Sequence, residues 1–252
     1  MTLAGNAALA AAALAPGLAL GSFLNVVAAR VPLKRSIVSP GSACMSCGRE
    51  VAWYDNVPVV SYLVLRGRCR GCGERIGWVY PAVELVTALL VAGSFYAFGW
   101  SGRAFVAAFF CVVLVAVSAT DLWHRIVPNV IVLPAAALVL LAQTVLEPSP
   151  EWALGAFGAS LFLFLAAVAY PAGMGMGDVK LALLLGAMLG RLVPVALMLG
   201  MVAALVPSLV LLARHGRAAR KMAIPFAPFL ALGAVVALFW GDGLLDAYLD
   251  LF

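Results

Sequence analysis

Long apolar runs dominate the sequence and limit the folds that the chain can adopt. Seven of these runs are close to the length that a helix needs to cross the hydrocarbon core of a bilayer, and a shorter one follows Asp178. They cover residues 3–29, 82–98, 104–120, 130–146, 152–170, 192–213 and 226–240. Lipid tolerates only helices or closed barrels, and the alternating strands of a barrel are absent. We therefore predict an all-α, polytopic integral membrane bundle of about eight transmembrane helices.

Composition agrees with a membrane location. The 252 residues are 65% hydrophobic and only 11% charged, whereas soluble domains are about half apolar. The net charge of +5 reflects the membrane topology and attraction to anionic lipid more than a nucleic-acid partner, because basic and aromatic residues are not interleaved. The bilayer is thus a predicted partner and nucleic acid is not.

The basic residues predict the orientation of the chain. If the N-terminus lies outside, all 16 Lys and Arg residues except Arg103 and Arg191 fall in cytoplasmic segments, as the positive-inside rule requires. No basic residue precedes the first apolar run, so we interpret that run as a retained helix rather than a secretory signal. The large polar segment that follows it is therefore expected in the cytoplasm.

Four of the five cysteines lie in that polar segment, in two similar stretches, "CMSCGREV" and "CRGCGERI". Two Cys-x-x-Cys pairs, each followed by glycine, are typical half-sites of a tetrahedral zinc ion. The predicted ligands are Cys44, Cys47, Cys69 and Cys72, and the zinc is structural because four thiolates leave no open position. Disulfides are disfavoured by a reducing cytosol, and a redox dithiol pair is the main alternative.

Ionisable residues are scarce in the apolar runs, where only Glu84, Asp121 and Asp178 stand near run ends. Asp121 ends a run directed inward and Asp178 begins one directed outward, so both are expected near the cytoplasmic boundary. Two carboxylates at one depth predict a pair that shares a proton, as in an aspartic protease. Taken singly, Asp121 is better explained by pairing with Arg125, and Asp178 by capping a helix, so the functional interpretation depends on the two together with the glycines.

Glycines surround the second aspartate in "AGMGMGDVKLA", residues 172–182. Gly173, Gly175 and Gly177 leave no side-chain bulk beside Asp178, so that an extended peptide can approach the backbone. We therefore regard Gly175 and Gly177 as candidates for substrate approach.

Seven ordered motifs together resemble the type IV prepilin peptidases, which are membrane aspartic proteases of the GxGD class. The motifs are "GSFLNVVAARVP" at 21–32, the two cysteine pairs, "NVPVVSYLVLRGRC" at 56–69, "YPAVEL" at 80–85, "DLWHRIVPN" at 121–129, "GMGDVKLA" at 175–182 and "IPFAPFLALG" at 224–233. The chain departs from the family at Ala227, where the last motif usually has glycine.

The resemblance implies a bifunctional enzyme of the bacterial inner membrane. Such an enzyme cleaves the basic leader of prepilins and pseudopilins after a glycine, with Asp121 and Asp178 as the catalytic pair. It then methylates the new N-terminal residue with S-adenosylmethionine. The resemblance assigns methylation to residues 1–100, with the cysteine loop at about 32–79, and proteolysis to residues 101–252.

Three other functions stay open at this point. The protein could be a peptidase without methylation activity. It could instead be a transporter that uses the aspartate pair as a proton relay. The third alternative is a scaffold that docks a secretion partner through its zinc loop. Asn25, Arg30 and Glu84 are candidates for the methyl-donor site, but helix–helix hydrogen bonding or membrane anchoring explains them equally well. Neither the methyl-donor residues nor the oligomeric state is predicted.

Overall fold

The computed structural model describes residues 3–170, 174–216 and 224–250. It divides the chain into two compact units, Met1–Ala119 and Thr120–Phe252. In the described residues the regular structure is helical, apart from two isolated β-bridges, which confirms the all-α prediction.

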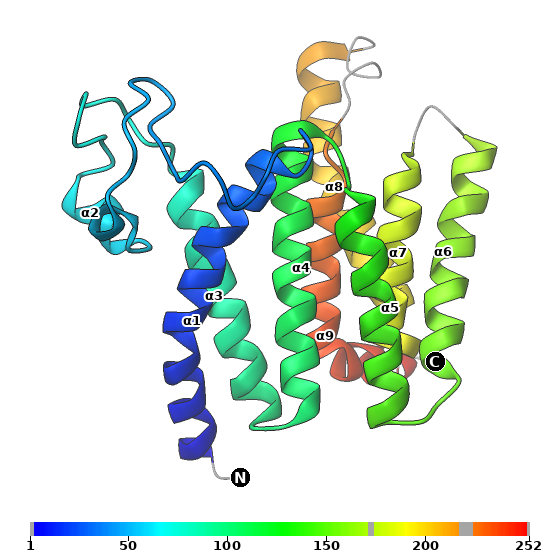
Figure 1. The fold of residues 1–252 in the computed structure, drawn as a ribbon. Helices are drawn as coiled ribbons and strands as arrows, with labels where there is room; N and C mark the ends of the chain where they lie inside the picture. Colours follow the sequence, from blue (N-terminus) through cyan, green and yellow to red (C-terminus); the bar gives the residue numbers. More distant parts are fainter. Residues whose placement is uncertain (1–2, 171–173, 217–223, 251–252) are drawn as a thin grey trace. The chain divides into compact units, whose positions relative to one another are not determined.

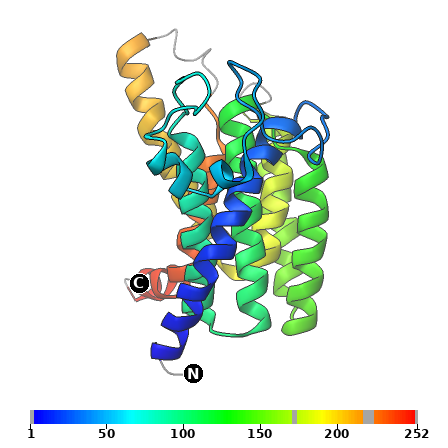
Figure 2. The same ribbon diagram turned by 60° about the vertical axis from the view of Figure 1, so that its left-hand side comes forward.

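The first unit contains α1 (Leu3–Arg30), η1 (Trp53–Asn56), α2 (Val60–Val64), α3 (Val79–Phe98) and all but the last residues of α4 (Gly102–His124). The second unit contains the end of α4 followed by α5 (Asn129–Leu146), α6 (Glu151–Ala169), α7 (Met176–Leu189), η2 (Gly190–Leu192), α8 (Val193–His215) and α9 (Ala227–Leu249). Figures 1 and 2 show the two sets of helices in colours that follow the sequence.

Seven described segments are long and apolar enough to cross a membrane, and one of them is the 40-residue stretch Met176–His215. The η2 turn divides this stretch into α7, which has 14 residues, and α8, which has 23. The residue after α7, Gly190, has a φ of +51°, which L side chains rarely adopt. The predicted count of about eight helices therefore includes α7 as a short, separate helix.

In the first unit, α1 and α3 pack antiparallel through very small residues (Figures 1 and 2). A Cβ added at Gly17 would lie 2.7 Å from the Cα of Ala88, and one at Gly21 would lie 2.6 Å from the Cα of Glu84. One further turn along the same face of α1, Asn25 Nδ2 donates to the Tyr80 carbonyl at 3.1 Å. Glycines four residues apart allow such close backbone contact in membrane helices.

In the second unit, α7 is the buried helix. From Val179 to Leu189 almost all of its side chains are enclosed, while α5, α6 and α9 contact it. Gly155 of α6 and Gly186 of α7 meet backbone to backbone, because a Cβ at Gly155 would lie 2.8 Å from the Gly186 carbonyl oxygen. At the far end of α7, the buried Gln143 of α5 donates from Nε2 to the Met188 carbonyl at 3.1 Å.

Adding a methyl group between α6 and α7 is expected to destabilise the second unit. In Gly186→Ala the new Cβ meets the Gly155 backbone, so we expect a loss of about 1–3 kcal/mol in the free energy of unfolding. Thermal unfolding of the purified protein in detergent measures this loss.

Gly158→Ala on α6 is the matched control, because a Cβ there meets nothing within 4 Å. This variant is expected to unfold at or slightly above the wild-type temperature, since alanine favours helix over glycine. Equal destabilisation by the two substitutions would contradict the close contact.

Candidate active site and metal centre

Asp121 lies in the last turn of α4 and is only 6% exposed. Its Oδ2 accepts a hydrogen bond of 3.1 Å from the backbone N–H of Ala227, the first residue of α9. An N–H in the first turn of a helix has no partner within that helix, so it is free to hold a carboxylate. This bond joins elements 106 residues apart and fixes the orientation of the Asp121 carboxyl.

Asp178 lies in the first turn of α7 and is half-buried. The helix is capped at Gly175, whose carbonyl accepts the Asp178 N–H at 3.1 Å, so Asp178 stands inside the first turn and is not the cap itself. The Asp178 carboxylate is close enough to Asp121 for the two to interact electrostatically. The two predicted carboxylates thus lie within range of an electrostatic interaction, and Arg125 also interacts electrostatically with Asp121.

The glycines beside Asp178 differ in their surroundings. Gly175 is exposed, and a Cβ there would lie 3.6 Å from Asp178 Oδ2. At Gly177 a Cβ would lie 2.8 Å from Val127 Cβ. The absence of a side chain at Gly177 therefore lets Val127, in the connection between α4 and α5, pack against the start of α7. Gly173 lies outside the described residues. Open space for a peptide is therefore found at Gly175 rather than at Gly177.

The four predicted metal ligands converge in the first unit. One Sγ atom from each of Cys44, Cys47, Cys69 and Cys72 lies within 4.8 Å of the others, and Cys44 Sγ is 3.8 Å from Cys72 Sγ. Sulfur atoms bound to zinc at about 2.3 Å stand about 3.8 Å apart at the corners of a tetrahedron. The four sulfurs therefore fit a tetrahedral ion.

The two cysteine stretches fold in the same way. The Cys44 N–H donates to the Arg49 carbonyl at 2.9 Å, and the Cys69 N–H donates to the Glu74 carbonyl at 2.8 Å. In each stretch the glycine after the second cysteine has a positive φ, +69° at Gly48 and +74° at Gly73. Each turn is also closed by an isolated β-bridge. The similarity of the two sequences is thus a similarity of structure.

The thiols of this cluster differ in acidity. Backbone N–H groups of Cys47 and Ser46 lower the pKa of Cys44 to about 6. Although the backbone at Glu74 lowers the pKa of Cys72, desolvation and the three other cysteines raise it to about 12. Without a metal ion, four thiols this close do not all lose their protons, because the negative charges repel one another. A bound dication balances these charges and stabilises four thiolates. The donor set thus suits a metal ion better than four free thiols.

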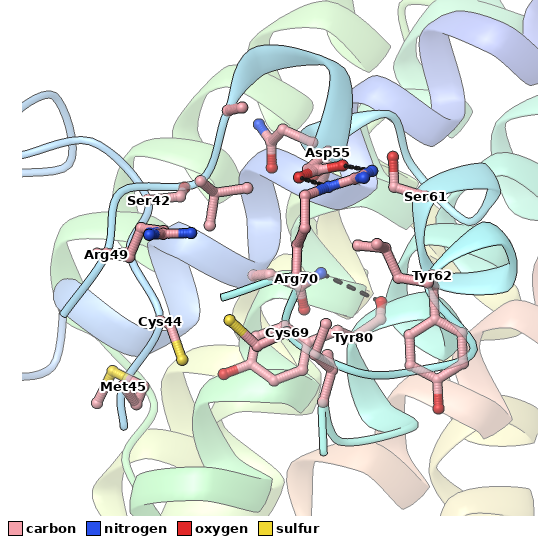
Figure 3. A pocket seen from close by; sticks show the side chains of 18 of the residues that line it. Ser42, Cys44, Met45, Arg49, Asp55, Ser61, Tyr62, Cys69, Arg70 and Tyr80 are labelled. Carbon is pink, nitrogen blue, oxygen red and sulfur yellow. Dashed lines mark hydrogen bonds and ion pairs between the residues drawn. The ribbon is translucent and has the colours of Figure 1, made fainter. Parts of the chain in front are cut away.

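An ion pair that the sequence analysis missed supports the second cysteine turn. Arg70, between Cys69 and Cys72, donates from Nε and Nη2 to the two carboxylate oxygens of Asp55 at 2.8 and 2.7 Å. These hydrogen bonds hold the pKa of the Asp55 carboxyl below its usual range. The Arg70 guanidinium also lies 5.6 Å from the centre of the Tyr54 ring. The pair fastens η1 to the second turn (Figure 3).

Comparisons with known proteins give two family matches and a set of close relatives. Residues 16–98 match the bacterial peptidase A24 N-terminal domain, and residues 108–209 match the type IV leader peptidase family. A Bacillus subtilis (strain 168) protein named prepilin leader peptidase/N-methyltransferase is 36% identical over 93% of this chain and 96% of its own.

Proteins with the same name from other bacteria are similar to this chain as well. The one from Pseudomonas aeruginosa is 36% identical over 93% of this chain and 91% of its own length, and the one from Myxococcus xanthus is 41% identical over 80% and 63%. The comparison with solved structures found no match.

The hydrogen bond from Ala227 gives a prediction for stability. Asp121→Ala leaves the buried N–H of Ala227 unpaired, so this variant is expected to lose about 1–3 kcal/mol of unfolding free energy. Asp121→Asn removes the same charge but keeps an oxygen acceptor, and its loss is expected to be smaller. Thermal unfolding in detergent compares the two variants, and equal losses would refute the role given to this bond.

Proposed function

The chain belongs to the type IV leader peptidase family, and we propose that it processes prepilins and pseudopilins in two steps. It first cleaves the basic leader peptide after a glycine. It then methylates the new N-terminal residue with S-adenosylmethionine as the methyl donor. The relatives that cover most of the chain are named for both activities, which favours two steps over proteolysis alone. Family membership leaves the transporter and scaffold alternatives without support.

Cleavage is proposed to use Asp121 and Asp178 as a carboxylate pair. The ionised member takes a proton from water as the water oxygen bonds to the scissile carbonyl carbon, while the protonated member donates a hydrogen bond to the carbonyl oxygen. The C–N bond then breaks and the leaving amine takes up a proton. The observation that supports this proposal is the electrostatic interaction between two acids, one from α4 and one from α7, together with the exposure of Gly175 next to Asp178.

Each carboxylate serves a different need in this scheme. Asp121 is held by the Ala227 N–H and is buried, so it has a fixed orientation. Asp178 is half-exposed and can be reached by water and peptide. Two like charges at short range disfavour double ionisation, which keeps one proton on the pair.

We propose that the protein lies in the bacterial inner membrane with its N-terminus outside and both the cysteine loop and the aspartates at the cytoplasmic face. The distribution of Lys and Arg supports this orientation. The residues of about 1–100 would then serve methylation and residues 101–252 proteolysis. The two family matches, over residues 16–98 and 108–209, are compatible with this division.

The residues that would hold zinc are Cys44, Cys47, Cys69 and Cys72, which fit a tetrahedral ion. Bound zinc would fold the polar loop, which is too small to build an apolar core. In this role the zinc takes no part in either reaction.

Loss of either aspartate is expected to abolish cleavage. Asp121→Asn and Asp178→Asn should each lower the rate of prepilin cleavage by about 100-fold or more, because each removes an acid–base group. The assay follows shortening of a purified prepilin by gel electrophoresis, and mass spectrometry identifies the new N-terminus.

Asp242→Asn is the matched control for cleavage. Asp242 also belongs to the second unit but forms an exposed ion pair with Arg191 at 2.9 Å. This variant is expected to cleave at the wild-type rate. Full cleavage by either of the first two variants would refute the assignment of the pair, and a wild-type protein that leaves prepilin intact would refute the peptidase function.

Zinc binding predicts one zinc ion per chain in purified protein, measured by elemental analysis. Cys44→Ser and Cys72→Ser should lower the zinc content severalfold and expose the loop to protease, because a three-sulfur site holds zinc more weakly. Cys111→Ser, in a buried position on α4, should leave the zinc content unchanged. Wild-type protein that contains no zinc, or full zinc in the two loop variants, would contradict the site.

A further inference from the structure

A partly open cavity of about 400 Å³ lies in the first unit and is lined by residues of α1, α3 and the cysteine loop. Figure 3 shows its lining, with Cys44 and Cys69 on one side and Asp55, Arg70 and Tyr80 on others. The volume is within the range of about 300–1,000 Å³ typical of small-molecule sites. The aspartate pair plays no part in its lining.

One buried acceptor in the cavity wall has no partner. Asn25 is 5% exposed, and its Nδ2 donates to the Tyr80 carbonyl at 3.1 Å. Its Oδ1 lies out of contact with solvent and has no hydrogen-bond partner in the described part of the chain. Buried polar atoms are almost always paired, so an unpaired oxygen on a residue that lines a cavity points to a ligand with a donor or a positive charge.

A carboxylate lies beside Asn25 in the same wall. Glu84 is 8% exposed, and its Oε2 accepts the Val59 N–H at 2.8 Å. The Ser22 hydroxyl also interacts with Glu84. Glu84 lies one turn after Tyr80 on α3, where Gly21 brings α1 into backbone contact. The close packing of α1 and α3 thus contributes two residues with oxygen acceptors, Asn25 and Glu84, to the lining of one cavity.

The remaining charges of the cavity wall are already partly balanced. The Asp55 carboxylate is satisfied by both nitrogens of Arg70, while Arg49, Glu50, Glu74 and Arg75 are of mixed sign. Glu84, by contrast, has no basic partner among the described ion pairs. The acceptor face formed by Asn25 and Glu84 is therefore the part of the wall suited to a cationic group.

We propose that S-adenosylmethionine binds in this cavity, with its positively charged sulfonium facing the Asn25 Oδ1 and the Glu84 carboxylate. This inference rests on the proposed methyltransferase function. The apolar and aromatic lining, which includes Val26, Val51, Tyr54 and Tyr80, provides surface for the nucleoside. The ammonium of a newly cleaved substrate N-terminus is also positively charged and could occupy the same place. The experiment therefore distinguishes binding of the sulfonium from binding of this ammonium.

The experiment measures the binding of S-adenosylmethionine and of S-adenosylhomocysteine to the full-length protein in detergent, without peptide, by isothermal titration calorimetry. The two compounds share every group except the methyl and its charge. Wild-type protein is expected to prefer S-adenosylmethionine. Glu84→Gln keeps an acceptor for the Val59 N–H, so it should weaken that ligand by about tenfold and S-adenosylhomocysteine much less.

Asn25→Leu should weaken S-adenosylmethionine by a similar factor, and Asn6→Leu is its matched control. Asn6 also lies on α1, donates from Nδ2 to a carbonyl of α3 at 3.0 Å and has an unpaired Oδ1, but it does not line the cavity. Asn6→Leu is expected to bind as wild type. Prepilin cleavage, assigned to the other unit, confirms that each variant is folded.

Wild-type affinity in both Glu84→Gln and Asn25→Leu would overturn the proposal, even if the wild-type protein methylates cleaved prepilin. Loss of peptide binding in these variants, with donor affinity unchanged, would assign the cavity to the new N-terminus and also overturn it. A wild-type protein that cleaves prepilin but neither binds the donor nor methylates the product would instead refute the methyltransferase function itself.

Discussion

Contact between helix backbones, made possible by glycine, is the interaction on which both units depend. Lipid provides no hydrophobic force between helices, so close packing must supply much of their association. Gly17 and Gly21 bring α1 against α3, and Gly155 and Gly186 bring α6 against α7. The first contact brings Asn25 to the Tyr80 carbonyl and Gly21 to the backbone of Glu84. The second holds the helix that begins near Asp178.

Each unit uses such packing to position polar groups that a membrane protein bears only at a cost. In the second unit, the Ala227 N–H at the start of α9 satisfies the buried Asp121. In the first, Asp55 and Arg70 satisfy each other, whereas Asn25 Oδ1 has no partner among the described residues. Asn6 Oδ1 is unpaired as well, but of the two residues only Asn25 lines the cavity, so its oxygen is the one that we assign to a ligand.

Most of the fold and the cysteine cluster were predictable because their signals are local or compositional. Apolar length predicted the helices, the repeated Cys-x-x-Cys-Gly pattern predicted the metal cluster, and scarcity of charge singled out Asp121 and Asp178. The Asp55–Arg70 pair has no such signal, because it joins residues fifteen apart in an irregular loop. The four-residue spacing of Gly17, Gly21 and Asn25 was also a signal in the sequence, but it was not interpreted. Their partners on α3 could not be predicted from it, because the spacing on one helix does not show which other helix packs against it.

The short length of α7 has a consequence for the path of water. Fourteen residues rise about 21 Å, some 9 Å less than the hydrocarbon core of a bilayer. Because α5, α6 and α9 surround it, the mismatch falls inside the protein and does not deform the lipid. Gln143 satisfies the Met188 carbonyl at the far end of α7. A helix of this length leaves Asp178, in its first turn, a shorter apolar path to water than a helix that matched the full thickness of the core would leave.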